Sequence, residues 1–284
     1  MSVEEVQKEK VCSVERICKR QDMTRDAYYK TRKRMLSRKA IEGIILSLIK
    51  DRRKELAREG GRKLHKALQS AFQEQNVYIG RDKLFDLLRA NNMLVRRKKS
   101  YHRTTNSNHR FRKYPNLIKD LNITGPNQVW VSDITYIKLV KGHCYLALIT
   151  DVYSRKIVGY DLSDSLELMG CLRALKQALR HIPAAHNLIH HSDRGVQYCS
   201  YIYTELLQEH KIRISMTEEN HCYENAIAER VNGILKDEFY LDYSFDTTLQ
   251  AQKVCRNAVN LYNHKRLHLS LNYQTPDMVH KLTA

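Results

Sequence analysis

Three acidic residues lie in surroundings that suit phosphoryl chemistry. Asp133 interrupts the apolar run VWVSDITYI, Asp193 follows the stretch NLIHHS, and Glu229 lies within NAIAERVNGILKDEF, with 35 residues between the last two acids. An aspartate inside a sheet is costly to bury without a partner, and three carboxylates can converge only around cations. Two hard divalent ions would bind them and stabilise the attacking and leaving oxygens of a phosphodiester. Each acid alone has a common structural explanation as a turn, cap or solvated residue.

The segment around Glu229 predicts a helix with one polar stripe. Its polar residues follow the spacing i, i+4, i+7 and i+11, and they are Asn225, Glu229, Asn232 and Lys236. Residues at this spacing share one face of an α-helix, while the apolar residues of the segment occupy another face. We therefore expect Glu229 and Lys236 to point toward one site.

The elements that must position these residues alternate between strand and helix. Three β-rich runs are followed by alternating helical and strand segments, which indicates a mixed α/β sheet. The expected strands are 127–139, 142–152, 155–163, 187–193 and 213–217, and the expected helices are 165–181, 198–210, 225–239 and 247–264. Asp133 then lies within a strand and Asp193 at a strand end, where sites are commonly built.

The charge of the chain is divided unevenly. The sequence has 284 residues and a net charge of +18, with 31 Lys and Arg against 13 Asp and Glu in residues 1–116, and 18 of each in residues 117–284. All of the positive excess is therefore N-terminal. Such clustering indicates a first part that binds a polyanion, the alternative being a merely soluble basic surface.

The basic part of the chain is expected to be helical. Residues 13–34 contain two short helical patterns with Thr24 as N-cap of the second, which suggests a helix-turn-helix. After a third apolar-periodic stretch, a second pair of patterns occupies 60–75 and 80–94, with Lys and Arg opposite the leucines. This arrangement favours DNA binding, and an inert helical bundle is the alternative.

A basic linker follows these helices. No acidic residue occurs from Leu87 to Lys119, and residues 95–116 have no apolar periodicity. We expect this segment to be irregular and to contact phosphates, with Tyr101 and Tyr114 available to stack on bases. The expected DNA contacts in it are Arg96, Arg97, Lys98, Lys99, Arg103, Arg110, Arg112 and Lys113.

Four segments together resemble a known family. WVSDITYI, HSDRGVQY, NAIAERVNGILKDE and YNHKRLHLSLNYQTP occur in the order found in the second-frame (OrfB-type) catalytic products of bacterial insertion sequences, within the DDE transposase and retroviral-integrase superfamily. The resemblance covers nearly the whole chain. It departs from the family pattern before the glutamate, where Tyr223 and Glu224 replace the common Trp-Asp, and the sequence shows no Cys/His zinc module like that of retroviral integrases.

The resemblance implies a function and roles for particular residues. It implies an RNase H-like core that uses two Mg2+ or Mn2+ ions for 3′-end cleavage and strand transfer, with Asp133, Asp193 and Glu229 as metal ligands. It also implies DNA contacts by Lys236 and Asn232. Arg266 and His268 belong to a C-terminal signature with Tyr262, and we include them among the expected DNA contacts with a structural role as the alternative.

Other residues have simpler interpretations. His190 and His191 could bind metal, but histidines at a strand end as often hydrogen-bond to the neighbouring loop. Seven cysteines without a C-x-x-C pattern indicate reduced, mostly buried thiols. No apolar stretch reaches the length of a membrane span and the first residues have no signal-peptide pattern, so we expect a bacterial cytoplasmic protein associated with the nucleoid.

The predicted organisation is an α/β RNase H-like core preceded by an all-α DNA-binding region. The expected domains are a helix-turn-helix at 1–40, a second helical domain at 41–95, the basic linker at 96–122, the catalytic core at 123–245 and a C-terminal helix and tail at 246–284. The expected partners are double-stranded DNA, as element terminal repeats and target, further copies of the chain, and a first-frame (OrfA-type) protein. Two rival functions are an RNase H-like nuclease without strand transfer and a non-catalytic DNA-binding repressor.

Overall fold

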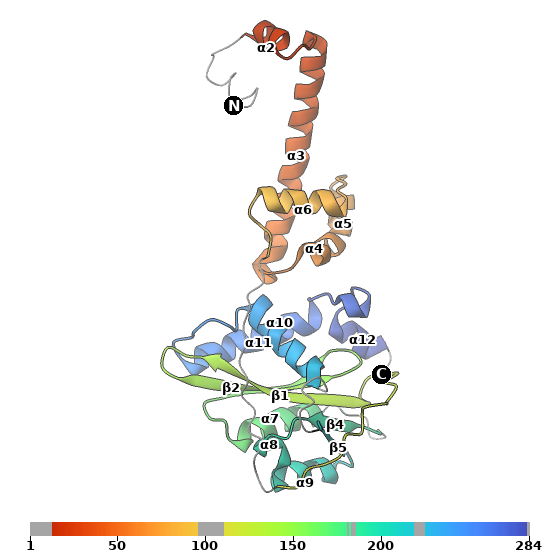
Figure 1. The fold of residues 1–284 in the computed structure, drawn as a ribbon, viewed down its shortest axis with the longest axis vertical. Coiled ribbons are helices and arrows are strands. Elements are labelled where there is room, and N and C mark those ends of the chain that lie inside the picture. Colours follow the sequence, from red (N-terminus) through yellow and green to blue (C-terminus); the bar gives the residue numbers. More distant parts are fainter. Residues whose placement is uncertain (1–12, 96–110, 181, 183–185, 219–224, 283–284) are drawn as a thin grey trace. The chain divides into compact units, whose positions relative to one another are not determined.

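The computed structural model describes residues 13–95, 111–180, 182, 186–218 and 225–282 (Figure 1). The chain divides into two compact units, the first formed by residues 1–52 and 68–93 and the second by residues 53–67 and 94–284. The segment 53–67, which the sequence grouped with 41–95, thus belongs to the unit that contains the sheet. Much of the predicted basic linker, from Arg96 to Arg110, lies outside the described residues.

The first unit is helical. It contains α2 (Val14–Arg20), most of α3 (Arg25–Glu55), α5 (Gln69–Glu74) and α6 (Arg81–Ala90). Thr24 accepts a hydrogen bond of 3.1 Å from the backbone N–H of Ala27, as its predicted N-cap role requires. The sequence indicated two separate helical stretches between residues 25 and 57, whereas the structure joins them into one helix, since residues 25–57 contain no proline and only one glycine, Gly43.

The second unit is built on a mixed sheet. Its strands are β1 (Val129–Lys138), β2 (His143–Asp151), β3 (Ile157–Ser163), β4 (Ile189–Ser192) and β5 (Arg213–Met216), in the order β3-β2-β1-β4-β5. β2 pairs antiparallel with β1 and β3, while β4 pairs parallel with β1 and β5. The mixed α/β sheet expected from the sequence is confirmed.

Helices cover both faces of this sheet. One face packs against α7 (Leu168–Leu179), α8 (Val196–Cys199) and α9 (Tyr201–Glu209), and the other against α10 (Ala226–Phe239) and α11 (Thr248–His264) (Figure 1). Trp130 and Ile149 belong to the first core, whereas Ile137 and Leu146 belong to the second. The alternation of strand side chains therefore supplies two cores from one sheet. The unit also contains the short helices α4 (Gly61–Ala67) and α12 (Pro276–Leu282), and a 3-10 turn at Leu269–Leu271.

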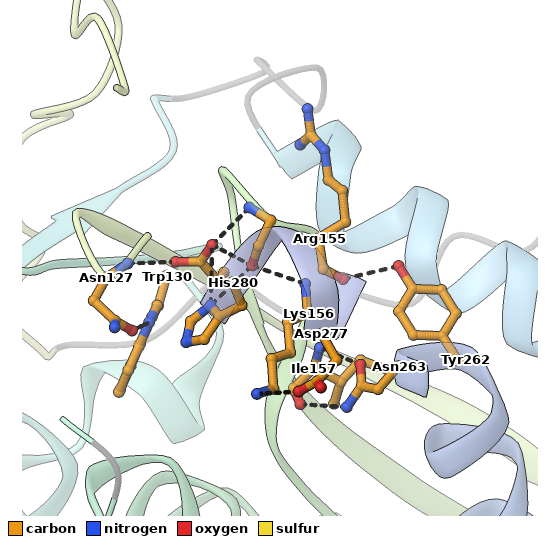
Figure 2. Close-up of polar contacts among 11 residues, drawn as sticks. Asn127, Trp130, Arg155, Lys156, Ile157, Tyr262, Asn263, Asp277 and His280 are labelled. Atoms are coloured by element: carbon orange, nitrogen blue, oxygen red, sulfur yellow. Dashed lines mark hydrogen bonds and ion pairs between the residues drawn. The ribbon is translucent and has the colours of Figure 1, made fainter. Parts of the chain in front are cut away.

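Side-chain amides hydrogen-bond to backbone groups of the edge strand β3. The Asn263 amide accepts from the N–H of Ile157 at 3.0 Å and donates to its carbonyl at 2.9 Å (Figure 2). Gln177 accepts from the N–H of Tyr160 at 2.8 Å, and Gln252 donates to the carbonyl of Leu162 at 3.0 Å. These bonds occupy backbone groups through which an exposed edge could pair with another strand.

Glycine at position 159 allows α7 to lie directly on β3. A Cβ atom there would come within 2.2 Å of the carbonyl oxygen of Ala174, so any side chain would push the helix off the sheet.

Two further expectations concern the whole chain. The described cysteines, at positions 18, 144, 171, 199 and 255, are all buried free thiols, while Cys12 and Cys222 lie outside the described residues. None of the helices in the described ranges is both long and apolar enough to cross a membrane.

Candidate active site

Asp133 lies in β1, on the side of the strand that faces α10. Its Oδ2 accepts a hydrogen bond of 2.7 Å from the side-chain amide of Asn232, and its Oδ1 accepts one of 3.0 Å from the backbone N–H of Ile134. Burial, reinforced by the negative charges of Asp193 and Glu229, raises the pKa of Asp133 to about 7. The carboxylate is therefore in an environment that a bound cation would stabilise.

Asp193 is brought beside Asp133 by the parallel pairing of two strands. Ser132 in β1 is paired with Ser192 in β4, so the two aspartates are the next residues on adjacent strands. The N–H of Gly195 donates to Asp193 Oδ1 at 3.0 Å, and a Cβ at Gly195 would come within 3.0 Å of the same oxygen. Glycine here lets the backbone approach the carboxylate more closely than a side chain would allow.

Glu229 lies in the first turn of α10. Its side chain is largely exposed and partial burial raises its pKa, while its charge contributes to the raised pKa of Asp133. Within the described part of the chain, no three His, Cys, Asp or Glu side chains are close enough together to hold a metal ion as they stand. The fold thus brings Asp193 and Glu229 close enough to affect the pKa of Asp133, but the three side chains as they stand do not form a complete set of metal ligands.

The polar stripe of α10 faces β1. Asn225 donates from its side-chain amide to the carbonyl of Ser132 at 3.2 Å, and Asn232 bonds to Asp133. Lys236 is partly buried; burial lowers its pKa, which the nearby Asp133 carboxylate partly offsets. Asn232, which the sequence places among the expected DNA contacts, is buried and bonded to Asp133.

His190 and His191 are buried members of a hydrogen-bond network. His190 Nε2 lies 2.7 Å from Ser132 Oγ and 3.0 Å from the Tyr203 hydroxyl, and burial lowers its pKa to about 3. His191 Nδ1 lies 2.8 Å from Ser215 Oγ. Both therefore connect β4 to neighbouring elements, His190 to β1 and α9 and His191 to β5, and not to the loop after β4 as the simpler interpretation expected.

Arg266 and His268 are both buried. Arg266 is only 5% exposed, and its guanidinium donates from Nε and Nη2 to the two carboxylate oxygens of Glu238 at 2.9 and 2.7 Å. His268 is buried with its ring edge-on to Tyr262 at 5.1 Å, and burial lowers its pKa to about 2. Burial of both side chains supports the structural role that the sequence left as the alternative.

Only the end of the basic linker is described. Arg112 and Lys113 are exposed, which agrees with their availability to phosphates, whereas the other six expected linker contacts lie outside the described residues. Tyr114 packs partly buried against the core and lies under the guanidinium of Arg112 at 5.1 Å. Its ring is therefore a packing element rather than a free stacking platform.

Two residues near the site were missed by the sequence analysis. Ser132 is fully buried between Asn225 and His190, and Glu238 binds Arg266 at the end of α10. Small polar residues beside a strand aspartate carry little sequence signal. Glu238 had one weak signal, since it lies on the helix of Glu229 but outside its polar stripe.

Comparisons with known proteins identify an integrase core in this chain. Two models described as Integrase core domain match residues 123–222 and 210–276. A 31 kDa protein of insertion element IS600 from Shigella sonnei is 38% identical over 213 residues, which cover 74% of this chain and 78% of that protein. The transposase of IS904 from Lactococcus lactis is 37% identical over 57% of this chain and 65% of its own.

A solved structure is also similar. The catalytic core domain of HTLV-2 integrase in complex with magnesium is 21% identical, with a TM-score of 0.44, and the match covers 55% of this chain and 97% of that domain.

Proposed function

Since this chain belongs to the insertion-sequence transposases with an integrase core domain, we propose that it cleaves the 3′ ends of its element and joins them to target DNA. One arrangement carries the proposal. Asp133 follows Ser132 in β1 and Asp193 follows Ser192, the last residue of the parallel strand β4, and the helix that bears Glu229 is bonded to Asp133 through Asn232. The raised pKa of Asp133 supports these three acids as one cation-binding group.

The donor set fits a hard divalent ion. Three carboxylates provide the oxygen ligands that Mg2+ and Mn2+ prefer, and Asp133, Asp193 and Glu229 would hold two such ions. Bound there, the ions would supply positive charge to the attacking and leaving oxygens of a phosphodiester. No covalent intermediate with the protein is required by this chemistry.

The remaining residues of the site orient the acids and the DNA. Asn232 fixes the orientation of the Asp133 carboxylate, and Asn225 fixes the start of α10 against β1. Lys236 lies about 10 Å further along α10 than Glu229 on nearly the same face, because seven residues advance the helix by about 700°. Its ammonium would bind a phosphate beside the scissile one.

The positive charge of residues 1–116 suits binding to the element ends, since that part contains 31 basic against 13 acidic residues. We propose that several copies assemble on DNA, with a first-frame protein as a further partner, in the bacterial cytoplasm where both DNA and protein are found.

The test uses the full chain and a plasmid carrying the DNA that flanks its own gene, which includes the element ends. Incubation with Mg2+ or Mn2+ should yield 3′-cleaved ends and products in which those ends are joined to target DNA. Cleavage without joining would support the nuclease alternative. Binding with neither cleavage nor joining would support the repressor alternative.

A further inference from the structure

The last turn of α10 is held by a buried cluster of charges. Glu238 receives two hydrogen bonds from Arg266, at 2.9 and 2.7 Å, and one from Lys63 Nζ at 2.7 Å. The side chains of Lys63, Arg266 and Glu238 are 8%, 6% and 20% exposed. Burial acts to raise the pKa of Glu238, but Arg266 and Lys63 lower it below its usual value, while burial and Arg266 lower the pKa of Lys63. A bidentate arginine fixes both distance and orientation of a carboxylate.

This cluster contacts the face of α10 opposite the one that bears Glu229. Glu238 comes nine residues after Glu229, which advances the helix by about 900° and about 13.5 Å, so the two side chains lie on opposite faces. The front face bears Glu229 and Lys236, and Asn232 bonds it to Asp133. The back face is bonded, through Glu238, to the signature segment, residues 262–268, which contains Arg266.

A second anchor lies beside the first. Arg58 donates to the backbone carbonyl of Asp237 at 2.8 Å and to the Tyr243 hydroxyl at 3.0 Å, with its guanidinium 4.2 Å from the centre of the Tyr240 ring. Arg58 and Lys63 both come from the segment 53–67. That segment therefore binds the end of α10 at two points, while the chain continues from both of its ends into the helical first unit.

The signature segment is itself fixed to the sheet. The Tyr262 hydroxyl donates to the carbonyl of Arg155 at 2.9 Å, next to β3 (Figure 2), and the Tyr262 ring packs against His268. The segment that bears Arg266 is thus bonded, through Tyr262, to the connection between β2 and β3. A rigid support is what a residue needs to set the position of another element.

We propose that Glu238 is a positioning residue for the reaction: held by Arg266 and Lys63, it sets the rotation of α10 and thereby places Glu229 and Lys236 at the site. The inference deepens the proposed function and rests on it. It assigns the signature residues Tyr262, Arg266 and His268 to the support of the catalytic helix. Glu238 acts through α10 and does not touch the reacting atoms.

The test compares Arg266→Lys and Lys63→Met in the full chain, with Arg173→Lys as the matched control. Arg173 also makes a bidentate contact, with Asp161 at 2.9 and 2.8 Å, but it belongs to α7 and its side chain is 51% exposed. Each variant is assayed for 3′-end cleavage, for DNA binding and for the Mn2+ concentration that gives half-maximal cleavage, and the folded fraction is measured by circular dichroism.

Arg266→Lys keeps the positive charge but cannot make two parallel hydrogen bonds to Glu238. We therefore expect cleavage per folded molecule to fall about tenfold and the Mn2+ requirement to rise. DNA binding should stay within about twofold of wild type. Lys63→Met should have the same effect but smaller. Exchanging the charges in Glu238→Arg with Arg266→Glu should restore part of the rate lost in Glu238→Gln.

Losses that match only the folded fraction, with an unchanged Mn2+ requirement, would overturn the proposal, as would an equal effect of Arg173→Lys. Absence of any metal-dependent cleavage by the wild-type chain would instead contradict the proposed function. The two failures are therefore distinguishable.

Discussion

Asn232 on α10 donates a hydrogen bond of 2.7 Å to Asp133 on β1, 99 positions earlier in the chain. This bond joins the helix of the third acid to the strand of the first. The amide donates to the Asp133 carboxyl group and so opposes the effect of burial on the pKa of Asp133. It keeps one oxygen occupied and the carboxylate oriented.

Replacing Asn232 with Leu should weaken metal use. The change removes the donor without adding a charge or a metal ligand, which leaves the Asp133 carboxylate poorly oriented. Groups that orient metal ligands affect metal affinity by about 10- to 100-fold, and we expect the Mn2+ concentration for half-maximal cleavage to rise by that order. Asn260→Leu, on the exposed side of α11, is the control. An unchanged Mn2+ requirement in Asn232→Leu would show that the bond has no part in metal binding.

Lys236→Ala should reduce binding of the element end and the yield of joined DNA. The ammonium donates to phosphate and cannot bind a cation, so the Mn2+ requirement should stay at the wild-type value. Lys236→Arg should retain part of the activity because it keeps the charge. Binding is measured by fluorescence anisotropy over a range of salt. If the alanine variant joins ends as well as wild type at every salt concentration, the polar face of α10 is only solvated.

The neutral, buried His190 predicts acid sensitivity of folding. Its pKa is lowered from 6.5 to about 3 in the folded protein. Above about pH 6.5 both states are neutral at this position, and between that value and about pH 3 the unfolded state alone binds the proton. The free energy of unfolding should therefore fall with falling pH, by up to about 1.4 kcal/mol per pH unit from this group.

The variant His190→Asn should lose that part of the slope in urea unfolding between about pH 6 and pH 4. His210→Asn, at the exposed end of α9, should retain the wild-type slope. Equal slopes in wild type and His190→Asn would mean that His190 takes up its proton in both states.

The charge division predicts where phosphate contacts are made. Substituting glutamine at the exposed residues Arg32, Lys33 and Arg34 of α3 should flatten the dependence of log affinity on log salt concentration, by about 0.9 for each lost contact. The pair Lys176→Gln and Arg180→Gln, in the charge-balanced second part, should leave the slope unchanged. Equal flattening in both sets would contradict an N-terminal location of the contacts.

The sequence indicated the sheet and the acids because their patterns are local. Alternation around Asp133, the strand end before Asp193 and the helical period around Glu229 each extend over one element. Asp133 and Asp193 lie close together because β1 pairs in parallel with β4. This contact joins segments about 60 residues apart, and the local periodicity of a sequence does not reveal it.

Other contacts were hidden for the same reason. Arg266 and His268 look like DNA-binding residues by type, but Arg266 is bonded to Glu238, 28 positions earlier, and His268 packs against the ring of Tyr262. The grouping of 53–67 with the sheet likewise depends on Arg58 and Lys63 meeting the end of α10. Ion pairs between distant segments leave no periodic signal in a single sequence, because either partner alone reads as an ordinary surface charge.

The most direct measurement of the central claim is DNA end joining by purified Asp193→Asn, with Asp164→Asn, an exposed aspartate after β3, as the control. The asparagine at 193 keeps the size of the side chain and removes the charge that would hold a divalent ion. We predict that Asp193→Asn binds the element end at least as tightly as wild type but neither cleaves nor joins it in Mg2+ or Mn2+, while Asp164→Asn does both. Cleavage and joining by Asp193→Asn at a near wild-type rate would contradict a role of Asp193 in metal binding.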